Sequence, residues 1–219
     1  MIVKRRSHEI KLVTSGYRMK CKICGKEAVY RCVTCGKLVC TTHIQLRPVC
    51  EECVRREVRK YFIREASDKD KEPISKIVEL FWGEQKQATF SKEYVIKDLP
   101  AFVALSEGKI AGFISYSELN KTDVLIVALG VLPEYQGSGI GKALLLKLEE
   151  KARFSKKKRL LVSTSNDDLP ALAFYQLMGF QIFEVVPNAI ADKHGAIFLG
   201  VGNIPIRDEI RLQKTIEEQ

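Results

Sequence analysis

A dense run of metal-binding side chains near the N-terminus constrains this chain more than any other feature. All seven cysteines of the 219 residues lie between Cys21 and Cys53. Together with one histidine they form four pairs, each with two residues between its members: Cys21 and Cys24, Cys32 and Cys35, Cys40 and His43, and Cys50 and Cys53. A gap of two residues lets both side chains of a pair reach one ion through a tight turn. Eight ligands therefore predict two tetrahedral metal sites.

The ligand chemistry predicts zinc. Soft thiolates and an imidazole favour zinc over magnesium or calcium. Each site would have four protein ligands and no position for water, so both ions are predicted to be structural. The alternative of disulfides is disfavoured, because a secreted disulfide scaffold would spread its cysteines over the whole domain. The segment has few large apolar residues, and we expect the metal to hold it together.

The ligand spacing resembles the B-box family of zinc modules and, less closely, other cross-brace fingers such as the HIT type. In such modules the first and third ligand pairs share one ion. The resemblance implies one site of Cys21, Cys24, Cys40 and His43 and a second of Cys32, Cys35, Cys50 and Cys53. This chain departs from the usual B-box in having cysteine at position 24 and a terminal cysteine pair where histidines are common.

Positive charge is concentrated in the same region. Residues 1–60 contain 15 Lys and Arg against 5 Asp and Glu, whereas residues 61–219 contain 21 against 22. The net charge of +9 therefore belongs to the N-terminal part. This distribution favours an anionic partner for that part, either an acidic protein surface or a nucleic acid. Few aromatic residues lie among the basic ones, which places protein contacts slightly ahead of base stacking.

Membrane insertion and secretion are not expected. The longest apolar runs are far shorter than the roughly 20 residues that span a bilayer. The N-terminus begins with basic residues but has no apolar stretch after them, so it does not read as a secretory signal. We expect a cytoplasmic protein without membrane contact. The sequence does not decide between a monomer and a homodimer.

The hydrophobic pattern divides the chain into a basic arm (1–20), the two-zinc module (21–56) and one larger domain (57–219). In the larger domain we expect strands first and then strands alternating with helices, which predicts a mixed α/β fold whose mainly antiparallel sheet is flanked by helices. The expected strands are 61–66, 101–105, 110–119, 123–131, 159–164, 180–186 and 209–215, and the expected helices are 73–81, 141–154 and 169–178.

A glycine-rich turn joins the strand 123–131 to the helix that follows it. Glycines at 137, 139 and 141 let the backbone approach an anion closely, and the free N–H groups at the helix start point toward it. The spacing fits neither the dinucleotide fingerprint nor the Walker loop, because Gln136 and Ala143 replace the glycine and hydroxyl residues that a Walker loop needs. A phosphate cradle of another kind is predicted, although a plain structural turn would also explain the glycines.

The pattern Gln136-x-x-Gly139-x-Gly141 resembles the pyrophosphate-binding loop of the GNAT acetyltransferase superfamily. The segment 171–180 (ALAFYQLMGF) resembles the second cofactor segment of that family, in the right order and at the right distance. The resemblance covers about residues 61–219. It implies a GNAT-like fold and an acyltransferase that uses acetyl-CoA as cosubstrate.

The resemblance also implies roles for individual residues. The strand end, Leu129 and Val131, would offer its backbone to the pantetheine arm and the thioester, and Asn166 would bind or position that arm. Tyr175 would protonate the departing thiolate, a task that suits a phenol; the alternative is an ordinary core aromatic. The pyrophosphate would be cradled by Gln136, Gly137, Ser138, Gly139, Ile140, Gly141 and Lys142.

The acceptor and its general base are not specified by any motif. Glu118, Asp123, Asp167 and Glu184 are candidates by their positions at strand ends, and water is the alternative. The favoured function is acetyl transfer to an amine of a protein or small molecule, with the zinc module recruiting substrate or partner. Two alternatives stay open: a nucleic-acid-associated acetyltransferase, and a non-catalytic acyl-CoA-binding protein.

Overall fold

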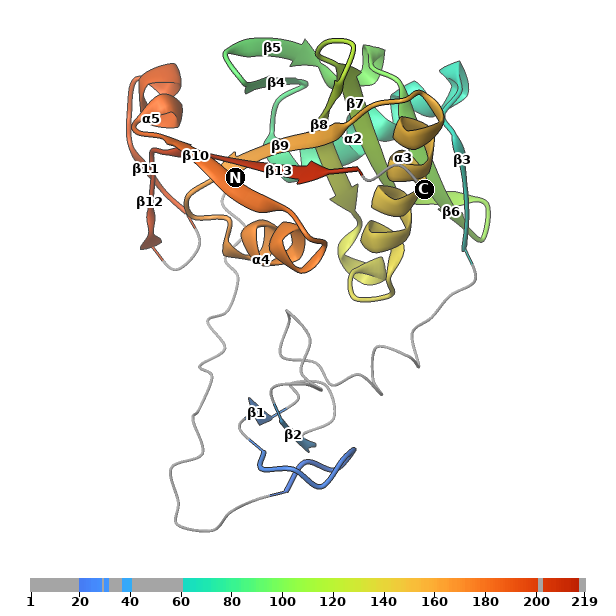
Figure 1. Cartoon of the computed structure of the whole chain (residues 1–219), viewed down its shortest axis with the longest axis vertical. Coiled ribbons are helices and arrows are strands. Elements are labelled where there is room, and N and C mark those ends of the chain that lie inside the picture. The colour runs from blue at the N-terminus through green and yellow to red at the C-terminus, as the bar shows by residue number, and fades with distance from the viewer. Residues whose placement is uncertain (1–19, 29, 32–36, 41–60, 201–202, 217–219) are drawn as a thin grey trace. The chain divides into compact units, whose positions relative to one another are not determined.

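The computed structural model describes residues 20–28, 30–31, 37–40, 61–200 and 203–216. The chain divides into two compact units, Met1–Val58 and Arg59–Gln219. In the described part of the first unit, two short strands, β1 (Tyr30–Arg31) and β2 (Leu38–Val39), pair antiparallel (Figure 1). A tight turn precedes them, in which the N–H of Gly25 donates to the carbonyl of Cys21 at 2.9 Å.

The second unit contains a seven-stranded sheet in the order β10-β13-β9-β8-β7-β6-β3. All neighbouring strands are antiparallel except β8 and β9, which are parallel. The strands are β3 (Tyr61–Glu65), β6 (Ala101–Ser106), β7 (Lys109–Glu118), β8 (Asp123–Val131), β9 (Arg159–Ser165), β10 (Gln181–Val186) and β13 (Glu209–Thr215). The expected mixed α/β fold with a mainly antiparallel sheet is confirmed.

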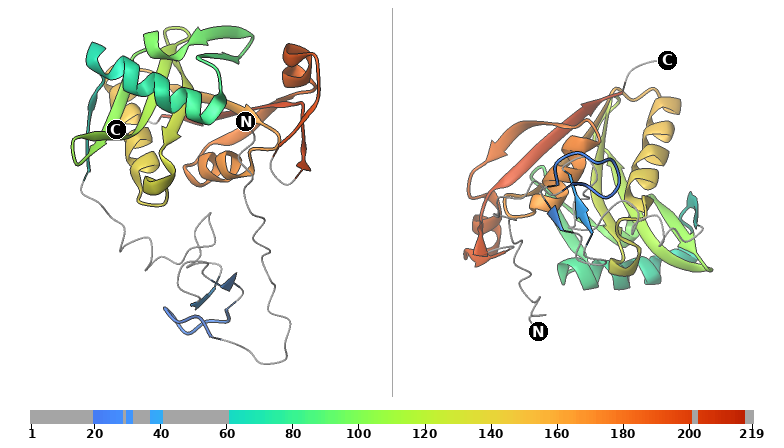
Figure 2. Two further views of the ribbon diagram at one scale, coloured as in Figure 1. Left: turned by 180° about the vertical axis from the view of Figure 1, so that it is seen from behind. Right: turned by 90° about the horizontal axis from the view of Figure 1, so that it is seen from below.

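Helices cover both faces of this sheet (Figure 2). On one face α2 (Lys71–Trp82) buries Ile74, Ile77 and Val78 against alternate residues of β6 and β7. On the other face α3 (Ile140–Phe154) and α4 (Leu169–Leu177) share a second core with β8, β9 and β13. The apolar positions of α3 recur with the 3.6-residue period of a helix and therefore lie on one side of it. Leu144, Leu145 and Leu148 on this side are fully buried against the sheet.

Several smaller elements were not expected from the sequence. They are η1 (Asp68–Asp70), the hairpin of β4 (Lys86–Thr89) and β5 (Lys92–Val95), η2 (Ile96–Asp98), η3 (Pro133–Tyr135), α5 (Ala189–His194), β11 (Phe198–Leu199) and β12 (Pro205–Ile206). The hairpin carries polar residues on both strands, and its turn residues Phe90 and Ser91 both have positive φ without being glycine or asparagine. Neither the alternation nor the turn chemistry that normally signals a hairpin is present.

The described residues include no helix that is long and apolar enough to cross a membrane.

Candidate functional site

A split opens in the sheet between β8 and β9. The two strands pair only from Asp123 and Arg159 to Ile126 and Val162. Beyond that point β8 continues to Val131 beside β7, and β9 continues to Ser165 beside β13. Val127 is an extra residue in β8, because Ile126 pairs with Tyr116 and Ala128 with Ser115. A bulge bends its strand, so Val127 accounts for the divergence of β8 from β9.

The edge of β8 presents backbone groups to this split. Gly112 pairs with Val131, and the N–H of Leu132 donates to the carbonyl of Ala111 at 2.9 Å. In an antiparallel ladder this pattern turns the N–H and C=O of Val131 away from β7, and those of Leu129 likewise. No strand pairs with them on the β9 side in the described part of the chain. Amide groups of a ligand in the split can therefore bond to the backbone of β8.

The glycine loop after β8 leaves backbone amides at the start of α3 without an acceptor within the residues that the structure describes. Gly137 and Gly139 have φ of 86° and 88°, a conformation that favours glycine. The first intrahelical bond of α3 runs from the N–H of Ala143 to the carbonyl of Gly139 at 3.0 Å, so the preceding amides, residues 140–142, have no acceptor among the described residues. These N–H groups and the exposed Lys142 fit a diphosphate. Ser138 instead directs its hydroxyl and its N–H to the carbonyl of Tyr135.

The loop, β8 and α4 meet at Gly141. A Cβ at this position would lie 3.7 Å from both the Phe174 ring and the Cγ2 of Val131. Phe174 is in turn in edge contact with Tyr175, with ring centroids 5.2 Å apart. Residues that the sequence placed in two separate cofactor segments are thus neighbours at one end of the split.

Tyr175 lies on α4 with only 6% of its surface exposed. Its ring packs against Phe174 and against Phe180, which lies just before β10. Burial, with a smaller effect of the nearby Asp168, raises the pKa of Tyr175 well above its usual value. The side chain is therefore a neutral phenol at physiological pH, which can donate a proton and cannot act as a base.

The Asn166 side chain forms hydrogen bonds with backbone groups of the protein. Its Nδ2 donates to the carbonyl of Pro205 at 2.8 Å, and its Oδ1 accepts from the N–H groups of Arg207 and Asp208 at 3.0 and 2.9 Å. These bonds tie the segment before β13 to the end of β9. Of the two roles considered for Asn166, positioning fits this geometry better than direct binding of the pantetheine arm.

The four carboxylates considered as general bases differ in place and partner. Glu118 and Asp123 lie at the end of β7 and the start of β8, away from Val131, and pair with Lys157 and Arg159 at 2.6 and 2.7 Å. Glu184 of β10 pairs with an arginine of β13 at 2.9 Å. Asp167 follows the end of β9 that borders the split, and it accepts from the Ser165 hydroxyl. Asp167 is the one candidate of the four that is near the split.

Glu209, which no motif singled out, is a buried carboxylate at the start of β13. It accepts from the N–H of Phe90 at 3.1 Å and pairs with Arg211 at 2.8 Å. Burial raises the pKa of Glu209, but hydrogen bonds from Ser163, Phe90 and Arg211 outweigh this effect and lower the pKa overall. Glu209 is thus an ionised residue that fastens the β4–β5 turn to the sheet, and a poor base.

Tyr61 is a second residue that sequence reasoning missed. Its hydroxyl lies 3.8 Å from the position that a Cβ would take at Gly139, so the first residue of β3 borders the glycine loop. Tyr61 belongs to no motif. Only its place at the start of an edge strand next to α3 brings it there.

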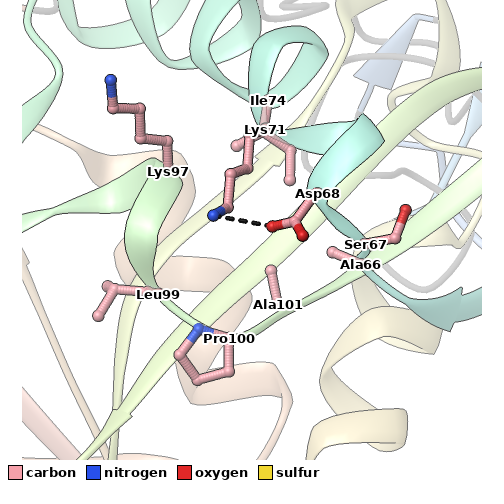
Figure 3. A pocket seen from close by; sticks show the side chains of 9 residues that line it. All are labelled: Ala66, Ser67, Asp68, Lys71, Ile74, Lys97, Leu99, Pro100 and Ala101. Carbon is pink, nitrogen blue, oxygen red and sulfur yellow. Dashed lines mark ion pairs between the residues drawn. The ribbon is translucent and has the colours of Figure 1, made fainter.

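A cavity of about 340 Å³ lies elsewhere in the domain. The start of α2 and the start of β6 line it, including Lys71, whose Nζ pairs with Asp68 at 2.9 Å (Figure 3). Phe81 of α2 packs beside Gly130, in the half of β8 that borders the split. It lies ten residues after Lys71 along α2, or ~15 Å away. The cavity is therefore separate from the split.

In the first unit, the structure brings three predicted zinc ligands together. The sulfur atoms of Cys21, Cys24 and Cys40 lie within 4.8 Å of one another, and those of Cys24 and Cys40 are 3.7 Å apart. These are three of the four ligands that the cross-brace pattern assigns to one ion. The fourth, His43, and the ligands of the other site, Cys32, Cys35, Cys50 and Cys53, lie outside the described residues.

Comparison with known proteins agrees with this geometry. The model of the acetyltransferase (GNAT) family matches residues 60–180. The uncharacterized protein YdhI of Bacillus subtilis is 36% identical over 141 residues, which cover 62% of this chain and 86% of YdhI. The N-alpha-acetyltransferase RimI of Mycobacterium tuberculosis is 36% identical over 47% of this chain and 66% of its own. The structure of the IAA acetyltransferase from Bacillus cereus matches 71% of this chain and 99% of its own, with a TM-score of 0.60 and 27% identity.

The chain belongs to the GNAT acetyltransferase family, and it is an acyltransferase that uses acetyl-CoA.

Proposed function

We propose that this protein transfers the acetyl group of acetyl-CoA directly to an amine, and that its N-terminal unit recruits the acceptor or a partner. The observation that carries the proposal is the split between β8 and β9. We take the open edge of β8, the amides at the start of α3 and the buried Tyr175 as parts of one acetyl-CoA site, because the loop, β8 and α4 meet at Gly141. RimI, a relative described as an N-alpha-acetyltransferase, supports an amine as acceptor.

Different residues of the site bind the cofactor and stabilise the developing charge. Acetyl-CoA supplies an activated acetyl group, which passes to the amine nitrogen as the C–N bond forms and the C–S bond breaks. The amides at the start of α3 and Lys142 hold the diphosphate, and the edge of β8 at Leu129 aligns the pantetheine arm. The N–H of Val131 donates to the acetyl oxygen, where negative charge develops.

Proton transfers complete the reaction. The Tyr175 hydroxyl donates its proton to the departing sulfur, and solvent returns a proton to the phenolate. The amine must lose one proton to become a nucleophile and another after the C–N bond forms. Asp167 lies nearest to the split among the carboxylates considered, and it accepts each of these protons in turn, directly or through water, and passes it to solvent.

The first unit is proposed to bind two structural zinc ions. The three clustered thiols fit one tetrahedral ion, to which His43 supplies the fourth ligand. Cys32, Cys35, Cys50 and Cys53 hold the second ion in the cross-brace arrangement. The basic surplus of residues 1–60 gives this unit an affinity for acidic partners that residues 61–219 lack.

A panel of acceptors tests the function. The full chain is supplied with acetyl-CoA and, in turn, with small amines, polyamines, lysine peptides and peptides with free N-termini, and the release of free thiol is followed. One class should release thiol far faster than the others. Repeating the panel without residues 1–56 shows recruitment as a rise in KM at unchanged kcat. Thiol release from no acceptor would favour the non-catalytic alternative.

A nucleic acid is the second candidate partner of the basic unit. Binding of RNA or DNA would weaken steeply with salt, since counterions are released for each phosphate that is contacted. Absent or salt-insensitive binding of the full chain to both polymers would leave an acidic protein as the partner.

A further inference from the structure

Gln136 has a partner that the sequence pattern does not suggest. The glycine-loop motif places this residue at the head of the pyrophosphate cradle. In the structure its side-chain Nε2 donates to the carbonyl of Val131 at 2.9 Å, and its own N–H donates to the carbonyl of Pro133 at 3.3 Å. The Gln136 amide is thus directed at the last residue of β8, next to the acyl centre.

This bond completes the fixation of one peptide plane. The N–H end of the peptide between Val131 and Leu132 donates to the carbonyl of Ala111 at 2.9 Å, and its carbonyl end accepts from Gln136. Both ends of the plane are therefore held. The N–H of Val131 belongs to the preceding peptide, whose Gly130 pairs with Phe113 of β7. With the following peptide also held at both ends, the backbone of Val131 is fixed on both sides of its Cα.

The bond from Gln136 also occupies the carbonyl oxygen of Val131, which would otherwise be unfavourable beside the acetyl group. The N–H and the C=O of Val131 both face the split, because both point away from β7. An uncovered carbonyl oxygen there would repel the negative charge that develops on the acetyl oxygen. The Gln136 amide occupies this acceptor and leaves the Val131 N–H as the group that the acetyl oxygen meets.

We propose that Gln136 is a positioning residue of the acyl centre, which fixes the Val131 peptide and covers its carbonyl. This inference rests on the proposed function and goes beyond it, because it moves Gln136 from phosphate binding to the transfer step. A phosphate ligand and a positioning residue make opposite predictions. Loss of a ligand weakens cofactor binding, whereas loss of positioning slows the step after binding.

The test replaces Gln136 by methionine, which keeps the length of the side chain and removes the donor. We expect kcat to fall about tenfold or more, less than the loss of a whole oxyanion donor, while the Kd of CoA changes less than about threefold. In the ligand-free protein, amide hydrogen exchange at Leu132 should become faster. The matched control is Gln85→Met, which removes an amide bond to the carbonyl of Ser75 on α2 at 2.9 Å and lies outside both cofactor segments. Its kcat, Kd and exchange at Leu132 should equal those of the unchanged protein.

The outcomes separate the two roles. A tenfold weaker CoA affinity in Gln136→Met with unchanged kcat and unchanged exchange at Leu132 would overturn the proposal and return Gln136 to the phosphate cradle. Unchanged values in all three measurements would overturn it as well. If the unchanged protein binds CoA but releases no thiol, the proposed function fails, and hydrogen exchange at Leu132 still decides whether Gln136 fixes this peptide.

Discussion

At the scale of single residues, Tyr175 is the proposed proton donor, and this role distinguishes an enzyme from a binding protein. Replacing Tyr175 by phenylalanine removes the proton donor and keeps the ring packing against Phe174 and Phe180. We expect kcat to fall by about 10² or more, with little change in the Kd of acetyl-CoA. Tyr116→Phe is the matched control, because Tyr116 is also a buried phenol but stacks on Phe102, away from the split. Equal activities of the two variants would remove Tyr175 from its role.

The raised pKa of Tyr175 makes a separate prediction about pH. A phenol whose pKa lies above its usual value stays protonated at higher pH, so its capacity to donate a proton persists beyond the ordinary titration of tyrosine near pH 10. The pH profile of kcat should therefore show no loss from this group below about pH 10. An alkaline decline near pH 8 that disappears in Tyr175→Phe would contradict the assignment.

The sequence could indicate these residues only where a motif contained them. The glycine spacing indicated the turn before α3, since backbone conformation at Gly137 and Gly139 depends on the residue type itself. It could not show that Gln136 bonds to Val131 or that Tyr61 borders the loop, because those contacts depend on how β8, β3 and α3 pack. The bonds from the backbone N–H groups of Arg207 and Asp208 to the Asn166 side chain could not be predicted for the same reason.

At the scale of elements, the contact between β7 and β8 supports the open edge. A Cβ at Gly112 would lie 2.7 Å from the carbonyl oxygen of Gly130, a backbone atom that cannot move away cheaply. Gly112→Ala should lower the free energy of unfolding by about 1–3 kcal/mol and weaken acetyl-CoA binding. Gly108→Ala is the comparison, because that site is open and only its φ of 76° opposes alanine, at about 1 kcal/mol. A smaller loss at Gly112 than at Gly108 would contradict this packing.

The start of α2 depends on a buried carboxylate. Asp70 accepts two bonds from Arg64, at 2.7 and 2.9 Å, and others from Ser67, and the Arg64 guanidinium holds the pKa of Asp70 well below its usual range. A lowered folded pKa contributes stability at neutral pH, which is lost as the pH falls below about 4. Asp70→Asn should therefore lower the free energy of unfolding by about 2 kcal/mol at pH 7, with a smaller difference in acid.

Denaturation followed by fluorescence measures this effect, because Trp82 on α2 is the only tryptophan of the chain. Asp68→Asn is the control: Asp68 pairs with Lys71 at 2.9 Å but its side chain is 92% exposed. Its replacement should change the stability by less than about 0.5 kcal/mol. A pH-independent loss in Asp70→Asn would mean that the ion pair is not the cause.

Elements with a strong period could be predicted, and polar ones could not. The strand 123–131 agrees with β8 at both ends, because its continuous apolar run is typical of a strand buried on both faces. The helix expected from Pro73 begins two residues earlier, at Lys71, since the capping box of Ser67 and Asp70 starts the chain turning before the apolar stripe. The β4–β5 hairpin carries no such signal, and tertiary bonds from Thr89 and Phe90 to Glu209 hold it.

At the scale of the whole molecule, the two units should respond differently to metal removal. Chelation should expose residues 21–53 to proteolysis, because zinc binding supplies the folding free energy of such a module. Acetyl-CoA binding should persist, since the site lies wholly in the unit Arg59–Gln219. Peptide mapping and calorimetry on the full chain measure both effects. Simultaneous loss of protection and of binding would show that the two units depend on one shared core.

The central claim is that this chain transfers an acetyl group to an amine. The most direct test supplies the full chain with acetyl-CoA labelled in the acetyl group, together with the best amine of the acceptor panel, and quantifies the labelled product and the free thiol. The account predicts one labelled amide for each thiol released. Thiol without labelled amide would indicate hydrolysis, and acetyl-CoA binding without thiol release would indicate a non-catalytic protein; either result would contradict the claim.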